Sequence, residues 1–314
     1  MILFAGGILL ISAFHFSKWG FTGSGTYVPP GKTEKLEAAL LEHVKKLSVE
    51  IPKNSRSSYD SVKLSAEYIR GEFKKAGYRS AYQEYKINNM SFRNISAIKE
   101  AANKRLIIIG AHYDAYFNPG ADDNMSSVAV LLETAKAAFD LDPSYSVNFV
   151  AFVNEEPPNF RTDTMGSYVY ARNLKEEDAD LEGAIILECV GFYSDKPASQ
   201  TYPPLFGFFY PNKGNFLALI SNFSSSKFAG TVEKAFKGST SLPLKKAVTF
   251  DFVPGVDFSD NWGFWKVGYP AVMLTDTAFF RNPNYHSSHD TFETLDYQKM
   301  SEIVTTLTHF IETK

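Results

Sequence analysis

The sequence is short of cysteine, with Cys189 as its only one in 314 residues. A single thiol rules out an intramolecular disulfide and a thiolate metal cage, although it does not identify the compartment. The chain also lacks an excess of charge, because its net charge is -3 and its pI is near 6.1. Nothing therefore indicates a nucleic-acid partner or an anionic membrane surface. Internal repeats are absent, and the composition, 44% hydrophobic and 21% charged, is that of a globular chain with one large core.

The N-terminus contains a run without charge. Residues from Ile2 to Phe14 are almost wholly apolar, and a Gly/Ser-rich stretch comes after them. Such a run is too short to cross a bilayer comfortably but fits the apolar region of an export signal. A buried core segment is the alternative, but no turn or amphipathic pattern connects the run to the next part of the chain. We therefore expect an export signal or short membrane anchor with a linker over residues 1–26, one domain over 27–314, and a periplasmic, membrane-anchored or extracellular protein.

The rest of the chain alternates between helical and strand patterns. Apolar residues at helical spacing predict helices over 33–47, 61–76, 126–139, 165–174 and 297–311. Apolar runs predict strands over 83–87, 92–98, 105–111, 146–153, 183–187, 216–221 and 271–275. This alternation indicates an α/β fold, a three-layer sandwich with a mixed, mostly parallel central sheet flanked by helices. The Pro- and aromatic-rich segment 201–215 is expected to be an insertion loop.

Histidine or carboxylate follows three of the predicted strands. His112 and Asp114 come after the first buried strand, Glu155 and Glu156 after the second, and Glu188 after the third. In such a sheet, ligands bind at the carboxyl ends of the strands. Each residue alone has an ordinary alternative, as a hydrogen-bonded pair, a solvated strand end or a buried carboxylate. Their joint occurrence at strand ends favours a metal site.

Two further segments contain candidate ligands. Asp122 and Asp123 lie in a turn before a predicted helix, where N-capping is the alternative explanation. His286 and His289 follow the last predicted strand, where they can reach the same crevice. The remaining histidines, His15, His43 and His309, are expected to be surface or packing residues.

Imidazole and carboxylate groups without thiolates suit zinc, with manganese or cobalt as substitutes. Two imidazoles and several carboxylates exceed the needs of one tetrahedral ion, so a carboxylate shared between two ions is the economical arrangement. Two such ions lower the pKa of bound water from ~15.7 toward ~7 and polarise a carbonyl. One carboxylate outside the ligand set must then act as general base. The sequence therefore predicts a two-metal hydrolase.

Five motifs, in this order, resemble those of the dinuclear-zinc exopeptidases: H-Y-D, P-G-A-D-D-N, N-E-E, L-E-C-V-G and Y-H-S-S-H-D-T. That family includes secreted bacterial leucyl aminopeptidases and glutamate carboxypeptidases, with glutaminyl cyclase as a divergent relative. The resemblance covers roughly Ser61 to the C-terminus. It implies two zinc ions, one held by His112, Asp122 and Glu188 and the other by Asp122, Glu156 and His286. Asp122 would thus bridge the two ions.

The resemblance also implies roles beyond the ligands. Glu155 would be the general base, and Asp114 would orient His112 from behind. Tyr285 matches a position that can hydrogen-bond the tetrahedral intermediate. A cis peptide bond is expected between Asp122 and Asp123.

The chain departs from the family pattern at a few positions. Glu188 stands where many members have aspartate, which preserves carboxylate ligation but changes its reach. Asn261 stands where a histidine is frequent, and an effect on pocket structure is expected there. His289 lies within the last motif, but the resemblance assigns ligation to His286.

These features predict a zinc-dependent exopeptidase that acts on peptides, most simply an aminopeptidase and a monomer. Alternatives are a glutaminyl-cyclase-like acyltransferase, a carboxypeptidase or dipeptidase of the same family, and a non-catalytic binding relative. The cyclase and the binding relative both fit less well, because each is expected to have lost ligands that this chain retains. Aromatic residues in 202–216 and 250–264 suit either an apolar substrate pocket or plain core.

Overall fold

The computed structural model describes residues 32–51 and 58–314. The apolar segment at the N-terminus, and with it the predicted export signal, lies outside the described residues. Within them, no helix has both the length and the apolar character needed to span a membrane.

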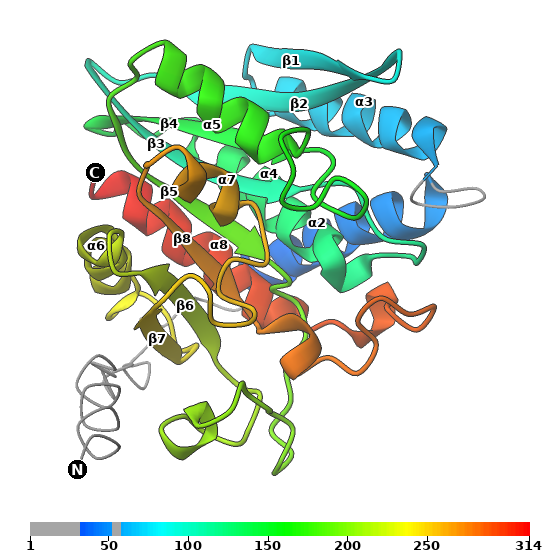
Figure 1. The fold of residues 1–314 in the computed structure, drawn as a ribbon, viewed down its shortest axis with the longest axis vertical. Helices are drawn as coiled ribbons and strands as arrows, with labels where there is room; N and C mark the ends of the chain where they lie inside the picture. The colour runs from blue at the N-terminus through cyan, green and yellow to red at the C-terminus, as the bar shows by residue number, and fades with distance from the viewer. Residues whose placement is uncertain (1–31, 52–57) are drawn as a thin grey trace, which may run out of the picture.

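The described strands form one mixed sheet in the order β1-β2-β4-β3-β5-β8-β6-β7 (Figure 1). In the middle, β4, β3, β5 and β8 are parallel to one another; β1 and β2 are antiparallel at one edge, and β6 and β7 run against β8 at the other. The predicted mixed, mostly parallel α/β sheet is confirmed. The strand bounds are β1 Ser80–Ile87, β2 Met90–Lys99, β3 Asn103–His112, β4 Tyr145–Phe152, β5 Leu181–Glu188, β6 Leu217–Asn222, β7 Leu244–Thr249 and β8 Ala271–Thr275.

Helices cover both faces of the sheet, as Figure 1 shows. One face packs against α2 (Lys32–Lys45), α3 (Tyr59–Lys75), α4 (Ser127–Ala138), α6 (Ser226–Phe236) and α8 (Tyr297–Glu312). The other packs against α5 (Gly166–Glu176) and the short α7 (Asn261–Lys266). Three layers result, as the sequence predicts.

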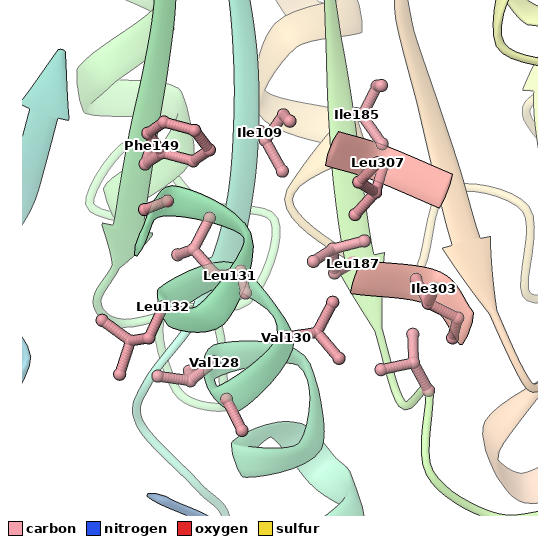
Figure 2. Packing of buried hydrophobic residues seen from close by; sticks show 14 of the residues in the cluster. Ile109, Val128, Val130, Leu131, Leu132, Phe149, Ile185, Leu187, Ile303 and Leu307 are labelled. Atoms are coloured by element: carbon pink, nitrogen blue, oxygen red, sulfur yellow. The ribbon is translucent and has the colours of Figure 1, made fainter. Parts of the chain in front are cut away.

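Because helices cover both faces of the sheet, the central strands are apolar on both sides and form continuous apolar runs in the sequence. On β3, Ile107 and Ile109 face the α4 side, whereas Leu106 and Ile108 face the α5 side. Figure 2 shows the first of these layers, where Ile109 and its neighbours on β4 and β5 lie against Val130 and Leu131 of α4. The central strands are thereby fixed on both sides, and their carboxyl ends form a rigid edge.

Apart from short 3-10 and π-helical turns, one strand and two α-helices of the described residues were missing from the sequence prediction: β7, α6 and α7. In α6 the buried residues Phe228, Ala229, Val232 and Phe236 do recur at helical spacing, but a Ser-rich stretch precedes them. In β7 two lysines interrupt the apolar pattern, because this strand lies at the edge of the sheet. The remaining helices and strands form where predicted, within a few residues at their ends.

Candidate metal centre

The structure brings the polar strand ends together. His112 ends β3, Glu188 ends β5, and Glu155 and Glu156 follow β4. Because β4, β3 and β5 are neighbours in the sheet, all four side chains reach the same edge. Each is at least nine-tenths buried.

Asp123 lies between two imidazoles. Its Oδ1 is 3.4 Å from Nε2 of His112, and its Oδ2 is 3.0 Å from Nε2 of His286. Nε2 of His112 is also 3.3 Å from Oε2 of Glu188, and Nε2 of His286 is 3.3 Å from Oε1 of Glu156. Two sets of three close ligand atoms therefore share Asp123: His112, Asp123 and Glu188 form one, and Asp123, Glu156 and His286 the other.

The shared carboxylate differs by one residue from the sequence prediction, which named Asp122. The carboxylate of Asp122 points away from the imidazoles, where its Oδ1 accepts the amide of Gly191 (2.9 Å) and its Oδ2 accepts Nδ2 of Asn282 (2.8 Å). The reason is the turn Ala121–Ser126, which departs from helical geometry at Asp123 and sends successive side chains to opposite sides. The cis peptide bond is likewise one residue further on, between Asp123 and Asn124.

Hydrogen bonds from distant segments hold this turn in place. The carboxylate of Asp290 accepts the amides of Asp122 (2.9 Å) and Asp123 (3.3 Å). Asn124 donates to the carbonyl of Leu187 (3.0 Å) and accepts the amide of Cys189 (2.9 Å). The turn is thus fixed to the end of β5 and to the last motif, which positions Asp123.

His286 is clamped between two aromatic rings. Tyr285 stacks on it at 4.0 Å between ring centroids with an interplanar angle of 11°, and Tyr116 at 4.6 Å with 13°. Its backbone is left-handed, with φ 54, a conformation that non-glycine residues adopt at some cost and that recurs at functional sites. His289, by contrast, is exposed, in agreement with its exclusion from the predicted ligands.

Asp114 organises the site in a different way from the one expected. Its carboxylate accepts the amides of Glu155 (3.2 Å) and Glu156 (3.0 Å), and so fixes the segment that follows β4. The atom that contacts Nδ1 of His112 is the backbone carbonyl of Asp114, at 3.1 Å, whereas its carboxylate Oδ1 is 3.8 Å away. A carbonyl can only accept, so Nδ1 carries a proton, and Nε2, which faces Asp123, is the candidate ligand atom.

Burial and the neighbouring charges together determine the pKa values of the site. Burial lowers the pKa of both imidazoles, but the carboxylates around them outweigh it: the pKa of His112 rises well above its usual value and that of His286 rises to about 10. Burial raises the pKa of Asp123, yet its two histidine partners bring it down to about 2. Burial, together with the neighbouring carboxylates, raises the pKa of Glu156 to about 7 and that of Glu155 well above its usual value.

Several buried atoms of this cluster have no hydrogen-bond partner within the described residues. They are Nε2 of His112, Oδ2 of Asp123 and Nε2 of His286. Buried polar atoms are almost always satisfied, so their convergence on one space calls for a cation that they can coordinate. Imidazole nitrogen and carboxylate oxygen are the ligand types that zinc takes in hydrolytic sites. The residues present thus fit a pair of metal ions.

Other supporting residues escaped the sequence analysis. Ser259 donates to Oε2 of Glu188 at 2.7 Å, and Asn282 and Asp290 hold the Asp122–Asp123 pair through the bonds given above. Asp290 belongs to the motif Y-H-S-S-H-D-T, which also contains His286. This position in the motif is the signal by which the sequence could have identified Asp290. The expectation for His43 is correct, since it is buried against Tyr68 and Glu133, away from the site.

An apolar pocket opens beside the cluster. Glu188 and Tyr285 form its border with the candidate metal centre. Segments 202–216 and 250–264 both contribute to its wall. The sequence left open whether they form a pocket or core, and they do both: Phe206, Val253 and Val256 are core residues and line the pocket. Asn261 supports this wall by donating to the carbonyl of Val256 (2.9 Å).

Comparisons with known proteins agree with this geometry. The sequence pattern of Peptidase family M28 matches residues 94–311. The protein YfbL of Escherichia coli (strain K12) is 39% identical over 275 residues, which are 84% of each chain. A probable leucine aminopeptidase of Trichophyton verrucosum (strain HKI 0517) is 26% identical over 263 residues, 79% of this chain. This chain spans only 64% of that relative's length.

Solved structures share the fold. A zinc aminopeptidase from Bacillus subtilis superposes with a TM-score of 0.69 at 16% identity, covering 88% of this chain and 94% of that one. LapB from Legionella pneumophila gives 0.67 at 18% identity, covering 98% and 80%. A glutaminyl cyclase from Bacteroides thetaiotaomicron gives 0.65 at 16% identity, covering 88% and 98%. At these identities the similarity concerns the fold alone.

Proposed function

Because the chain belongs to peptidase family M28, we propose that it is a zinc-dependent exopeptidase with two ions and that it removes N-terminal residues from peptides. The observation that carries the proposal is the position of Asp123, whose two oxygens face the two imidazoles. His112, Asp123 and Glu188 would hold one ion, and Asp123, Glu156 and His286 the other. When bound, the ions supply Lewis acidity that activates water and polarises the scissile carbonyl.

Glu155 is the residue we assign as general base. It is buried at the site, its Oε2 is 3.8 Å from Nε2 of His112, and it belongs to neither set of close ligand atoms. Burial raises the pKa of its carboxyl, which suits a group that must take a proton from water and return it to the leaving amine. The Asp114 carboxylate holds the backbone that carries Glu155 and Glu156. With the backbone fixed in this way, Glu156 would hold a metal ion and Glu155 would act on the water.

We assign Tyr285 as the hydrogen-bond donor that stabilises the negative charge developing on the tetrahedral intermediate. Burial raises the pKa of its phenol, so the hydroxyl remains protonated and can donate a hydrogen bond. Its ring is fixed by the stack on His286, and it lies on the border between the metal centre and the apolar pocket. A donor fixed in advance at this place stabilises a tetrahedral oxyanion.

The same pocket supports the choice of an aminopeptidase. An aminopeptidase holds the side chain on the carbonyl side of the scissile bond, and the apolar pocket next to Glu188 offers room for it. Several relatives of this chain are named as probable leucine aminopeptidases, which supports this choice. The cyclase alternative has support from the shared fold, but both complete ligand sets favour two-ion hydrolysis.

We also propose that the N-terminal apolar segment directs export or anchors the enzyme to a membrane. Its length and lack of charge support this. Fractionation of cells that make the full chain, with N-terminal sequencing of the product, tests it. Recovery of an uncleaved chain in the cytosolic fraction would contradict it.

The test of the proposed activity is hydrolysis of aminoacyl nitroanilides and of short peptides by the zinc-loaded full chain. We expect release of one N-terminal residue at a time, loss of activity with a chelator, and recovery with zinc. Release of C-terminal residues would instead identify the enzyme as a carboxypeptidase. Formation of pyroglutamate from N-terminal glutamine would transfer it to the cyclases.

A further inference from the structure

The apolar pocket extends across four neighbouring strands. Glu188 on β5 is the register partner of Thr275 on β8, Thr275 of Ala218 on β6, and Ala218 of Lys245 on β7. Register partners share one face of a sheet, and all four residues line the pocket. Neighbouring strands lie about 4.8 Å apart, and Glu188 and Lys245 are three strands apart. Their backbone positions are therefore separated by roughly 14 Å.

Small side chains keep space open above this row. Ala218 and Thr275 lie in its middle, and Ala247 on β7 lines the pocket in the next row. On this face α5 and α7 cover the strands up to β8, whereas β6 and β7 are covered by loops (Figure 1). The floor is therefore a strip of sheet with Ala218 and Thr275 in one row and Met273, Ile220 and Ala247 in the next, and no helix covers its outer half.

Two loops form a roof over the strip. Tyr202 and Phe206 come from the loop before β6, and Val253 and Val256 from the loop after β7. Phe206, Val253 and Val256 are buried in one cluster, which fixes the loops to each other. Between the two valines, Gly255 has φ +90, and a Cβ there would approach Cε2 of Phe280 to 3.0 Å, so the second loop packs closely against the 278–280 turn.

We call the space between this floor and this roof the slot; the residues that line it come from β5, β8, β6 and β7. A leucine or phenylalanine side chain extends over roughly half of the 14 Å between Glu188 and the edge strand. Beyond Thr275 the floor consists of aliphatic residues until Lys245, which places a cation at the far end. The slot thus fits a long apolar chain and favours a neutral or anionic group at its tip.

We propose that the acyl part of the substrate carries a long unbranched apolar chain, which lies over β8 and β6 and ends near Lys245. The proposal rests on the metal-dependent amide hydrolysis of the proposed function, because the scissile amide must lie at the metal centre for its chain to enter the slot past Glu188. In the reaction the C–N bond breaks, the water oxygen stays on the acyl carbon, and a proton goes to the leaving amine. The chain belongs either to an α-amino acyl group or to a simple fatty acyl group.

Chain length is the variable that tests this proposal. Nitroanilides of straight-chain 2-amino acids and of the matching fatty acids would be hydrolysed by the zinc-loaded full chain. We expect kcat/KM to rise about fourfold for each added methylene until the slot is full and to fall after that. The series with the higher values identifies the source of the chain. A profile that is flat or falls beyond leucine overturns the proposal.

A variant at the far end provides the structural control. Ala247→Trp should shorten the optimal chain and lower the ratio of long-chain to short-chain kcat/KM at least ~10-fold, because the outer half of the slot is filled. Lys246→Ala is the matched control, since Lys246 is on the opposite face of β7, where it pairs with Glu233. It should leave the chain-length profile unchanged. If Ala247→Trp does not fold, Ala218→Val should shift the profile in the same direction.

Binding of a dansyl fatty acid separates failure of the slot from failure of the proposed function. We expect saturable fluorescence enhancement with the zinc-loaded full chain, weakened at least ~10-fold by Ala247→Trp. Such binding without hydrolysis of any amide would overturn the proposed function and, with it, the substrate proposal. Hydrolysis of leucyl nitroanilide without dansyl binding would overturn the slot alone.

Discussion

Oδ2 of Asp123 lies 3.0 Å from Nε2 of His286, although the two residues belong to motifs at opposite ends of the peptidase domain. Its other oxygen faces His112, so one carboxylate connects both halves of the site. The neighbouring Asp122 has its oxygens occupied by Gly191 and Asn282. We therefore assign the two adjacent aspartates different roles: Asp123 as the proposed metal ligand and Asp122 as its support.

Substitution of these aspartates should separate the two tasks. Asp123→Asn should abolish tight binding of both ions and lower activity at least ~100-fold, because the shared ligand belongs to both sites. Asp122→Asn should weaken metal affinity by ~10- to 100-fold, the usual effect of losing a partner behind a ligand. Zinc titration of the purified variants measures both. Stronger metal loss in Asp122→Asn than in Asp123→Asn would restore Asp122 as the bridging residue.

Glu155→Gln should retain zinc and lower kcat by ~10²- to 10⁴-fold, the range for loss of general acid–base catalysis. The matched control is Glu156→Gln, one residue away, which should lose metal affinity because Glu156 belongs to the second set of ligand atoms. Measurements of metal content and of steady-state kinetics for the two variants test this prediction. Near-normal turnover in Glu155→Gln would remove Glu155 from the mechanism.

Tyr285→Phe should lower kcat by ~10²-fold with little change in KM, because the donor acts on the transition state. Tyr116→Phe is the control, since Tyr116 stacks on the other face of His286 and retains its ring in the variant. We expect that variant to resemble the parent. An equal loss in both would assign the effect to the position of His286.

Zinc binding should release protons at neutral pH. In the metal-free protein the carboxylates raise the pKa of His286 to about 10, so at pH 7.5 its imidazole carries a proton that a metal ion must displace. Metal affinity should therefore fall as the pH falls, and the release from His286 should vanish once the pH exceeds that pKa. Calorimetric titration in two buffers of different ionisation enthalpy counts the protons. Binding without net release at pH 7.5 would contradict this protonation state.

Two glycines should respond oppositely to alanine. In Gly263→Ala the new Cβ would lie 2.6 Å from the amide nitrogen of Tyr168, where α7 crosses α5, and the free energy of unfolding should fall by ~1–3 kcal/mol. Gly230→Ala, within α6, meets nothing within 4 Å and should raise it by ~0.5–1 kcal/mol. Denaturant unfolding checks both. Equal stability of the two variants would contradict the close contact of α5 and α7.

Much of the site could be predicted from the sequence because its residues end apolar runs. His112, Glu155, Glu156 and Glu188 follow runs that only a doubly covered strand explains, and parallel strands bring such ends together. The choice between Asp122 and Asp123 could not be predicted in this way. It depends on the non-helical backbone of the turn Ala121–Ser126, which amino-acid type alone does not determine.

The slot could not be predicted from the sequence for a different reason. The row from Glu188 to Lys245 exists because β8 lies between β5 and β6, although it comes last in the chain. Side-chain periodicity indicates which residues share a face of one strand, but not which strands are neighbours. The aromatic loop segments therefore looked equally suited to pocket and core.

The central claim is that Asp123 joins two metal ions, and an anomalous difference map from crystals of the zinc-loaded full chain tests it most directly. The account predicts two zinc peaks about 3.5–4 Å apart, one next to Oδ1 and the other next to Oδ2 of Asp123. A single peak, or two peaks that Asp123 does not join, would contradict it.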